Sequence, residues 1–164
     1  TELALSGQVH AVVTAPINKE ALRLGGVPYI GHTEMLADLA HAPENLTMFT
    51  VDRLRIFFFT RHLPLRTAIE AIEPARLCRH IVAVDHALQQ LRLEHRHIAV
   101  AALNPHAGEA CLLGSEEQER ITPAIEQAQA RGVDVSGPIP ADSVFHQALE
   151  GRWDAVGSRG HPVL

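Results

Sequence analysis

The sequence has few cysteines, few aromatic residues and no long hydrophobic run. Only two of its 164 residues are cysteine, and 4% are aromatic. Cys78 and Cys111 lie far apart, which argues against a disulfide framework and for a reducing, cytoplasmic location. The longest apolar runs, such as Ile56 to Phe59, are far shorter than the roughly 20 residues of a membrane helix. We therefore predict no membrane partner.

The chain also lacks a concentration of positive charge. It has 14 basic and 19 acidic residues, for a formal net charge of -5, and lysine and arginine are not clustered. A nucleic-acid partner is therefore not expected. A length of 164 residues with 46% hydrophobic side chains is enough to bury a core, so we predict that residues 1–164 form a single globular unit.

Apolar runs and helical periodicities alternate along the chain, and turn residues separate them. Thr33 and Ser115 are suitable N-cap residues for two of the helices, and Gly137 to Pro140 has the composition of a turn. We predict strands at 10–15, 46–51, 54–60, 98–103 and from 154, and helices at 17–24, 33–40, 74–91, 115–131 and 141–149. This alternation predicts an α/β fold with a mostly parallel or mixed sheet flanked by helices.

Asp52 and Arg53 join the second and third strands as a hairpin, Gly25 and Gly26 end the first helix, and an apolar stripe at spacings of three and four residues marks the helix at 74–91. Glu116 and Glu117 are favourable charges in the first turn of the helix at 115–131.

Eleven histidines are the unusual feature of the composition, because histidine supplies metal ligands and proton-transfer groups. His62 and His106 each follow an apolar strand, and each lies in a loop that contains proline. With His32 they mark three loops that could meet at the carboxyl ends of strands, where α/β folds bind ligands. From the residues alone, a metal site at His62 and His106 and a purely structural role are equally supported. Five other histidines are interpreted as solvated surface residues: His41, His80, His86, His95 and His97.

A second chemistry would be metal-dependent hydrolysis, for which Glu109 beside His106 is the candidate base. Glu34 and Asp142 are interpreted as first-turn or capping charges, and Lys19 as a surface residue or a phosphate contact. None of these is assigned as catalytic, and no residue is assigned to cofactor binding.

Five motifs in order resemble one enzyme family, the 4-hydroxythreonine-4-phosphate dehydrogenases of vitamin B6 biosynthesis. They cover nearly the whole chain at about the family's spacing, which makes the set far more specific than any one motif. The motifs are Thr-Ala-Pro-Ile-Asn-Lys at 14–19, Gly-His-Thr-Glu at 31–34, Arg-His-Leu-Pro-Leu at 61–65, Leu-Asn-Pro-His-Ala-Gly-Glu at 103–109 and Gly-Pro-Ile-Pro-Ala-Asp-Ser-Val-Phe at 137–145.

The resemblance implies an NAD- or NADP-dependent oxidoreductase that acts as a homodimer on a small phosphorylated hydroxy acid. It implies that His62 and His106 bind a divalent metal (Zn, Mg, Mn or Co), and that His32 and Thr33 bind the substrate. In the family, hydride transfer to the nicotinamide is followed by decarboxylation, and a Lewis acid on the alcohol oxygen assists both steps. The implied fold is the central part of a larger two-domain dehydrogenase.

The sequence departs from the family pattern near residue 157 and at both ends of the chain. Family members carry a third metal histidine, contributed by the partner subunit, in a Tyr-His-Asp-Gln-Gly motif; here residues 157–164 read Gly-Ser-Arg-Gly-His-Pro-Val-Leu. Gly160 matches the motif's glycine, so His161 follows the motif and is not assigned as a ligand. The family's N-terminal Pro-Gly-Glu-Pro-Ala-Gly signature and its C-terminal substrate-binding residues have no counterpart. We therefore expect a central fragment with negligible dehydrogenase activity.

Two further alternatives follow from these departures. The chain could be a decayed family member that acts only as a binding or dimerising module. Within the family, residues 57–62 and the pair Gly160-His161 lean toward the branch that acts on threonate or erythronate 4-phosphate.

Overall fold

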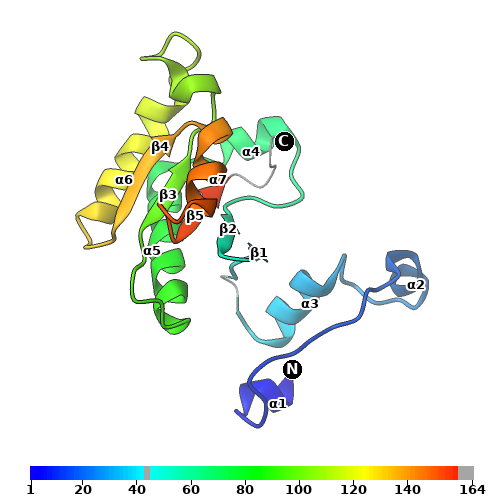
Figure 1. Cartoon of the computed structure of the whole chain (residues 1–164). Helices are drawn as coiled ribbons and strands as arrows, with labels where there is room; N and C mark the ends of the chain where they lie inside the picture. Colours follow the sequence, from blue (N-terminus) through cyan, green and yellow to red (C-terminus); the bar gives the residue numbers. More distant parts are fainter. Residues whose placement is uncertain (43–44, 159–164) are drawn as a thin grey trace. The chain divides into compact units, whose positions relative to one another are not determined.

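The structure, a computed structural model, describes residues 1–42 and 45–158. Its contacts cluster in two compact units, Thr1–Asn45 and Leu46–Leu164 (Figure 1). These two units are clusters of contacts, and neither has been shown to fold alone. The expectation that residues 1–164 form one globular unit therefore stays a prediction. No helix within the described residues is long and apolar enough to cross a bilayer.

The first unit contains three short helices, α1 (Glu2–Leu5), α2 (Lys19–Leu24) and α3 (His32–Leu39), and none of them contains a buried residue. The Asn18 side chain caps α2 by accepting a hydrogen bond of 3.0 Å from the backbone N–H of Ala21. The predicted helix end at Gly25 and Gly26 is confirmed. The strand predicted at 10–15 is wrong: these residues are exposed and unpaired, and a strand needs a hydrogen-bonded neighbour.

The second unit is built on a five-stranded mixed sheet in the order β1-β2-β5-β3-β4. β1 and β2 form the predicted antiparallel hairpin, and all other pairs are parallel. The strands are β1 (Met48–Val51), β2 (Leu54–Phe58), β3 (Ile98–Ala101), β4 (Val135–Ile139) and β5 (Ala155–Ser158). The predicted α/β fold with a mixed sheet is therefore confirmed.

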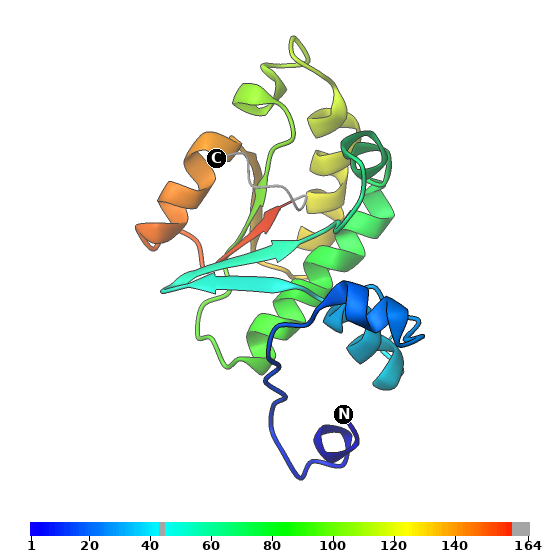
Figure 2. The same ribbon diagram turned by 90° about the vertical axis from the view of Figure 1, so that its right-hand side faces the viewer.

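Helices cover both faces of this sheet (Figure 2). α5 (Pro74–Gln90) and α6 (Thr122–Gln129) pack on one face and α7 (Ala141–Leu149) on the other, while α4 (Leu65–Glu70) follows β2. Successive residues of β3 serve the two cores, because side chains alternate along a strand: Ile98 and Val100 face α5 and α6, and Ala99 faces α7. The helices predicted at 74–91 and 141–149 are confirmed.

The turn predicted at 137–140 is wrong, because β4 runs through Gly137 and Pro138. β4 is an edge strand, where proline is tolerated, and its pairing with β3 shifts register between Ala99 and Ala101. Gly137 has φ 148°, and a Cβ at this position would lie 2.7 Å from the Val100 carbonyl oxygen. The glycine and proline that resemble a turn in the sequence thus permit a close strand pairing.

One predicted N-cap is also wrong: Gly31 caps α3, and Thr33 is its second residue. The helix predicted at 115–131 begins directly after Ser115, whose backbone carbonyl accepts a hydrogen bond of 2.9 Å from the Glu119 N–H, as the carbonyl of an N-cap residue does. It contains a π-helical turn, η2 (Glu117–Ile121), and continues as α6.

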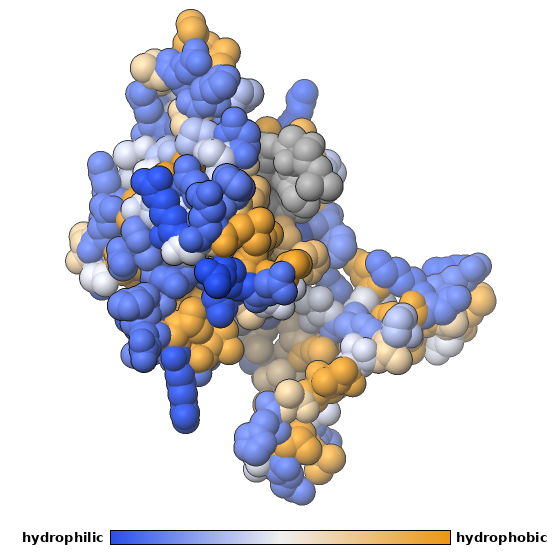
Figure 3. All heavy atoms as spheres, in the orientation of Figure 1, coloured by the Kyte–Doolittle hydropathy of each residue, from blue (hydrophilic) through white to orange (hydrophobic). Residues whose placement is uncertain are grey.

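The surface over the β1–β2 hairpin carries exposed hydrophobic side chains (Figure 3). Phe49 and Val51 on β1 are both more than half exposed, on the outermost strand of the sheet.

Candidate functional site

The candidate site lies at the carboxyl ends of the parallel strands. His62 follows the end of β2 and His106 follows the end of β3, and β5 lies between these two strands. Because neighbouring strands are about 4.8 Å apart, β2 and β3 are separated by roughly 10 Å. The sheet therefore delivers both predicted metal histidines to the same edge.

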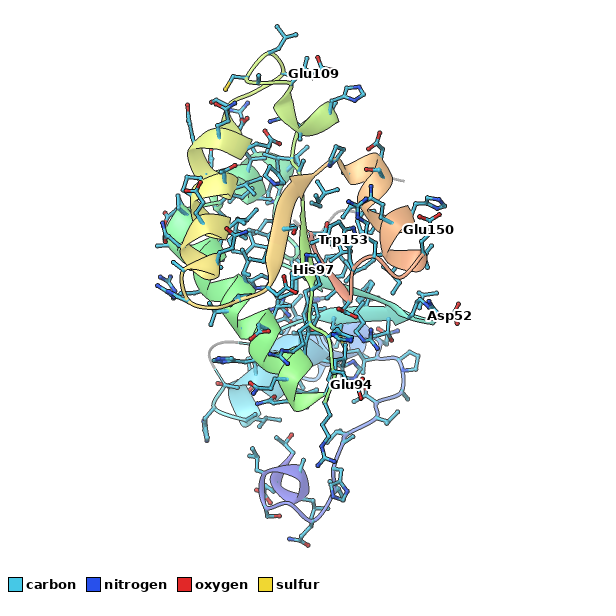
Figure 4. All side chains as sticks on the ribbon, turned by 60° about the vertical axis from the view of Figure 1, so that its left-hand side comes forward. Asp52, Glu94, His97, Glu109, Glu150 and Trp153 are labelled. Carbon is cyan, nitrogen blue, oxygen red and sulfur yellow. The ribbon has the colours of Figure 1, made fainter. Side chains whose placement is uncertain are left out.

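Both histidines occupy left-handed backbone conformations, with φ 52° at His62 and φ 51° at His106. The loop after β3 begins with a short 3-10 segment, η1 (Pro105–Gly108), and every residue from His106 to Cys111 has positive φ. Such conformations are unfavourable for residues with a Cβ and persist only where surrounding contacts impose them. Figure 4 shows this loop at Glu109, far from His97, which precedes β3.

A buried carboxylate contacts the start of this loop. Glu117 is 2% exposed, and its Oε1 accepts hydrogen bonds from the backbone N–H groups of Leu103 (2.8 Å) and Asn104 (2.6 Å). Its Oε2 accepts a hydrogen bond of 2.9 Å from the Asn104 side chain. Burial alone would raise the pKa of Glu117, but these hydrogen bonds to the ionised form outweigh it, and the pKa is lowered.

The imidazole rings of His62 and His106 are exposed and form no hydrogen bond with any described residue. Two accessible nitrogen donors at one sheet edge suit a divalent ion. No group of three histidine, cysteine or acidic side chains with metal-site geometry occurs within residues 1–42 and 45–158. His161 lies outside the described residues.

His32 and Thr33 are the first two residues of α3, in the first unit. Their N-cap Gly31 has no side chain to accept from the first-turn N–H groups, which leaves these donors available to an anion. Glu34 also lies in this turn, and its Oε2 comes within 3.3 Å of the position of a Cβ on Gly31. Nearby, the Tyr29 hydroxyl donates a hydrogen bond to Asp38, which ties the preceding loop to α3.

His80, interpreted from the sequence as a solvated histidine, is instead packed inside the protein. Its ring stacks edge-on against Phe59 with centroids 5.4 Å apart, and it lines a small apolar cavity of about 30 Å³ between α5 and the sheet. Its Nε2 is buried and has no hydrogen-bond partner among the described residues. Burial, with smaller contributions from the positive charges of Arg76 and Arg61, lowers the pKa of His80 to about 4.

We expect His80 to make stability depend on pH. The folded state holds it neutral down to about pH 4, whereas the unfolded chain protonates it near 6.5. The free energy of unfolding is therefore highest above pH 6.5, and it falls by up to about 3 kcal/mol as the pH drops to 4. Urea denaturation of the wild type and His80→Leu across this range measures the difference.

The control is the variant His86→Leu, because His86 is an exposed histidine on the same helix, α5. It should keep the pH dependence of the wild type, and His80→Leu should flatten it. Parallel curves for the wild type and His80→Leu would contradict the assignment.

His97 also departs from the solvated interpretation. Its Nε2 lies 2.9 Å from the Ser136 hydroxyl, and its ring stacks edge-on against Trp153 with centroids 4.6 Å apart (Figure 4). Its backbone N–H donates to Asp154 at 2.9 Å. These contacts join the amino ends of β3, β4 and β5, away from the candidate site, and fit a structural role.

Comparison with known proteins shows the family to which this chain belongs. A family model described as "Pyridoxal phosphate biosynthetic protein PdxA" matches residues 1–161. The chain belongs to this PdxA family. The resemblance of the five motifs is thereby confirmed, and the histidines at the sheet edge lie on a PdxA scaffold.

Relatives within the PdxA family carry related names. A "Putative D-threonate 4-phosphate dehydrogenase" of Fusobacterium nucleatum is 56% identical over 160 residues, which cover 98% of this chain and 48% of the relative. A protein of the same name from Halalkalibacterium halodurans is 52% identical with the same coverage. The chain thus spans about half the length of these curated relatives.

Solved structures agree with the fold. The 4-hydroxythreonine-4-phosphate dehydrogenase of Klebsiella pneumoniae superposes with a TM-score of 0.90 at 41% identity, over 98% of this chain and 48% of that one. The enzyme of the same name from Burkholderia phymatum gives a TM-score of 0.85 at 45% identity, over 98% and 49%. These likenesses confirm the expected fold.

Proposed function

We propose that this chain provides the metal-binding strands and a phosphate-binding helix of an NAD-dependent dehydrogenase. The reaction would be the metal-assisted oxidation, with decarboxylation, of a small phosphorylated hydroxy acid. One observation carries the proposal: in a PdxA family chain, His62 and His106 present unpaired rings at the ends of β2 and β3, on either side of β5. The names of the relatives make D-threonate 4-phosphate the first substrate to test and 4-hydroxythreonine 4-phosphate the second.

The donor set narrows the choice of metal. Neutral imidazole nitrogens suit Zn²⁺ and the neighbouring late transition metals, whereas Mg²⁺ prefers carboxylates, phosphates and water. We therefore favour Zn²⁺ or Co²⁺ over Mg²⁺ and Mn²⁺. When bound, the metal supplies a Lewis acid at the substrate's alcohol oxygen, and the nicotinamide accepts the hydride.

The residues of this chain contribute binding and orientation. His62 and His106 hold the metal from two strand ends, whose positions the sheet fixes. His32 and Thr33 bind the phosphate of the substrate at the start of α3, where free N–H groups and the helix dipole favour an anion. Glu109, the candidate base for a hydrolase, is exposed in the loop after His106, and family membership gives hydrolysis no support.

The homodimer, the cytoplasmic location and the use of NAD rather than NADP remain parts of this proposal and rest on the family resemblance. The alternative is a binding or dimerising module without turnover. The missing counterpart of the third histidine in residues 157–164 favours that alternative.

The test is to measure binding and turnover on the purified chain. We expect Zn²⁺ or Co²⁺ to bind, and D-threonate 4-phosphate to bind more tightly when the metal is present and to lose that gain after EDTA treatment. NADH formation, followed by its absorbance, should be far below the ordinary enzyme rate of about 10 per second. A metal held by two histidines, without the family's third, exchanges easily and orients the substrate poorly.

The Fusobacterium nucleatum relative serves as the positive control for substrate and metal. His32→Ala and Thr33→Ala should weaken binding of D-threonate 4-phosphate and leave binding of unphosphorylated threonate unchanged. Turnover of the chain near 10 per second would show that another group completes the metal site and would exclude the binding-module alternative. Absence of metal binding would refute the proposed function.

A further inference from the structure

Glu117 is an acidic side chain in the interior of the second unit that the proposed reaction leaves without a role. It is 2% exposed, and it lies at the start of the π-helical turn η2. π-turns inside helices are uncommon and frequently occur at functional sites, since they re-aim side chains at one position. Here the turn directs Glu117 toward the loop after β3.

The carboxylate holds that loop at two places. At one place it accepts hydrogen bonds from the backbone of Leu103 and from both the backbone and the side chain of Asn104. At the other place Gly108 packs against it: a Cβ on Gly108 would lie 3.0 Å from the Glu117 Oε2. His106 lies midway between Asn104 and Gly108. Both ends of the short segment that carries the histidine are therefore fixed by one carboxylate.

The loop would not keep this shape unaided. The run of positive φ from His106 to Cys111 is unfavourable for the residues with a Cβ. Gly114, further along the same loop, is packed so closely that a Cβ would lie 2.4 Å from the Asn104 side-chain nitrogen. The left-handed segment therefore needs support from its surroundings, and Glu117 and Asn104 are the polar side chains packed beside it.

The ring of His106 depends on this support. It is exposed and forms no hydrogen bond with a described residue, so the backbone, which places the Cα and Cβ of His106, decides which positions the ring can reach. We propose that Glu117 is the positioning residue of the site: it holds segment 104–108 and thereby aims the imidazole of His106 at the metal. The second half of this statement rests on the proposed function.

The test uses Glu117→Gln in the whole chain. The amide nitrogen introduced by this change faces the Asn104 amide nitrogen or the backbone N–H groups, so at least one donor meets another donor. In the metal-free protein, ¹⁵N relaxation should show order parameters of residues 106–108 falling from about 0.85 to below about 0.6. Zn²⁺ or Co²⁺ affinity, measured by calorimetry, should fall about 10- to 100-fold.

Leu88→Ala is the matched control. Leu88 is fully buried near the end of α5, beside the loop that leads into the amino end of β3, so its truncation lowers the melting temperature at the edge of the sheet opposite the loop after β3. It should change neither the order parameters of residues 106–108 nor the metal affinity. Should Glu117→Gln not fold, Asn104→Ala removes the side-chain hydrogen bonds to Glu116 and Glu117 but keeps the two backbone ones to Glu117, and it should produce the same changes at a smaller size.

The outcomes separate this inference from the proposed function. Unchanged order parameters in folded Glu117→Gln, or equal losses in Leu88→Ala, would overturn the positioning role. A wild-type chain that binds no metal would overturn the proposed function and the aiming of His106 with it, while the order parameters still decide whether Glu117 holds the loop.

Discussion

Replacing Gly137 with alanine is expected to lower the free energy of unfolding by more than about 4 kcal/mol, a large fraction of the stability of a typical domain. The added Cβ would lie 2.7 Å from the Val100 carbonyl oxygen and 3.1 Å from the Ile125 Cδ1 atom. Val100 belongs to β3, so its carbonyl cannot move without disturbing the β3–β4 pairing. Circular dichroism and urea denaturation would measure the loss.

Gly132→Ala is the control that separates strain from collision. Gly132 also has a positive φ, of 84°, but a Cβ there meets nothing within 4 Å. Its replacement should cost only the left-handed penalty of about 1 to 2 kcal/mol. Similar losses at the two positions would show that backbone strain, and not the close approach of the two strands, determines the effect at Gly137.

Replacing either His62 or His106 with alanine is expected to weaken Zn²⁺ or Co²⁺ binding at least about 100-fold, which corresponds to about 2.8 kcal/mol. Each ring would supply one of the few protein ligands, and a lone imidazole competes poorly with water for the ion. Both residues are exposed, so the melting temperature of the metal-free chain should change little. Calorimetric titration and the visible spectrum of bound Co²⁺ would measure the change.

The control for the histidine variants is His86→Ala, an exposed histidine on α5 away from the strand ends. It should keep the affinity of the wild type. Wild-type affinity in His62→Ala or in His106→Ala would remove that residue from the proposed metal site, and wild-type affinity in both would refute the site.

Local sequence patterns correctly predicted the helices and strands whose sequence signals lie entirely within their own residues. The stripe of α5, the unbroken apolar run of β3 and the Asp52-Arg53 hairpin are of this kind, and all three are confirmed. The failures depend on distant contacts. The segment at 10–15 has the composition of a strand but pairs with no strand in the described residues, while Gly137 and Pro138 enter a strand because Val100 lies close beside them.

The candidate site shows the same division. The positions of His62 and His106 at strand ends could be predicted, because each follows its own apolar run. The roles of His80 and Glu117 could not, because both depend on burial by other elements. Glu117 resembled a favourable first-turn charge, and the sequence offered one faint signal for more: two adjacent glutamates soon after a loop rich in glycine.

The strand order has a consequence for how the protein is made. β5 lies between β2 and β3, with Ile56 paired to Val156, yet it is the last of the five strands along the chain. During translation the β1–β2 hairpin and the β3–β4 pair emerge first, and neither can join the other before β5 has left the ribosome. Folding must then close contacts between residues far apart in the sequence, which is slow. Until β5 is inserted, the inner edges of β2 and β3 stay open to chaperones or to other nascent chains.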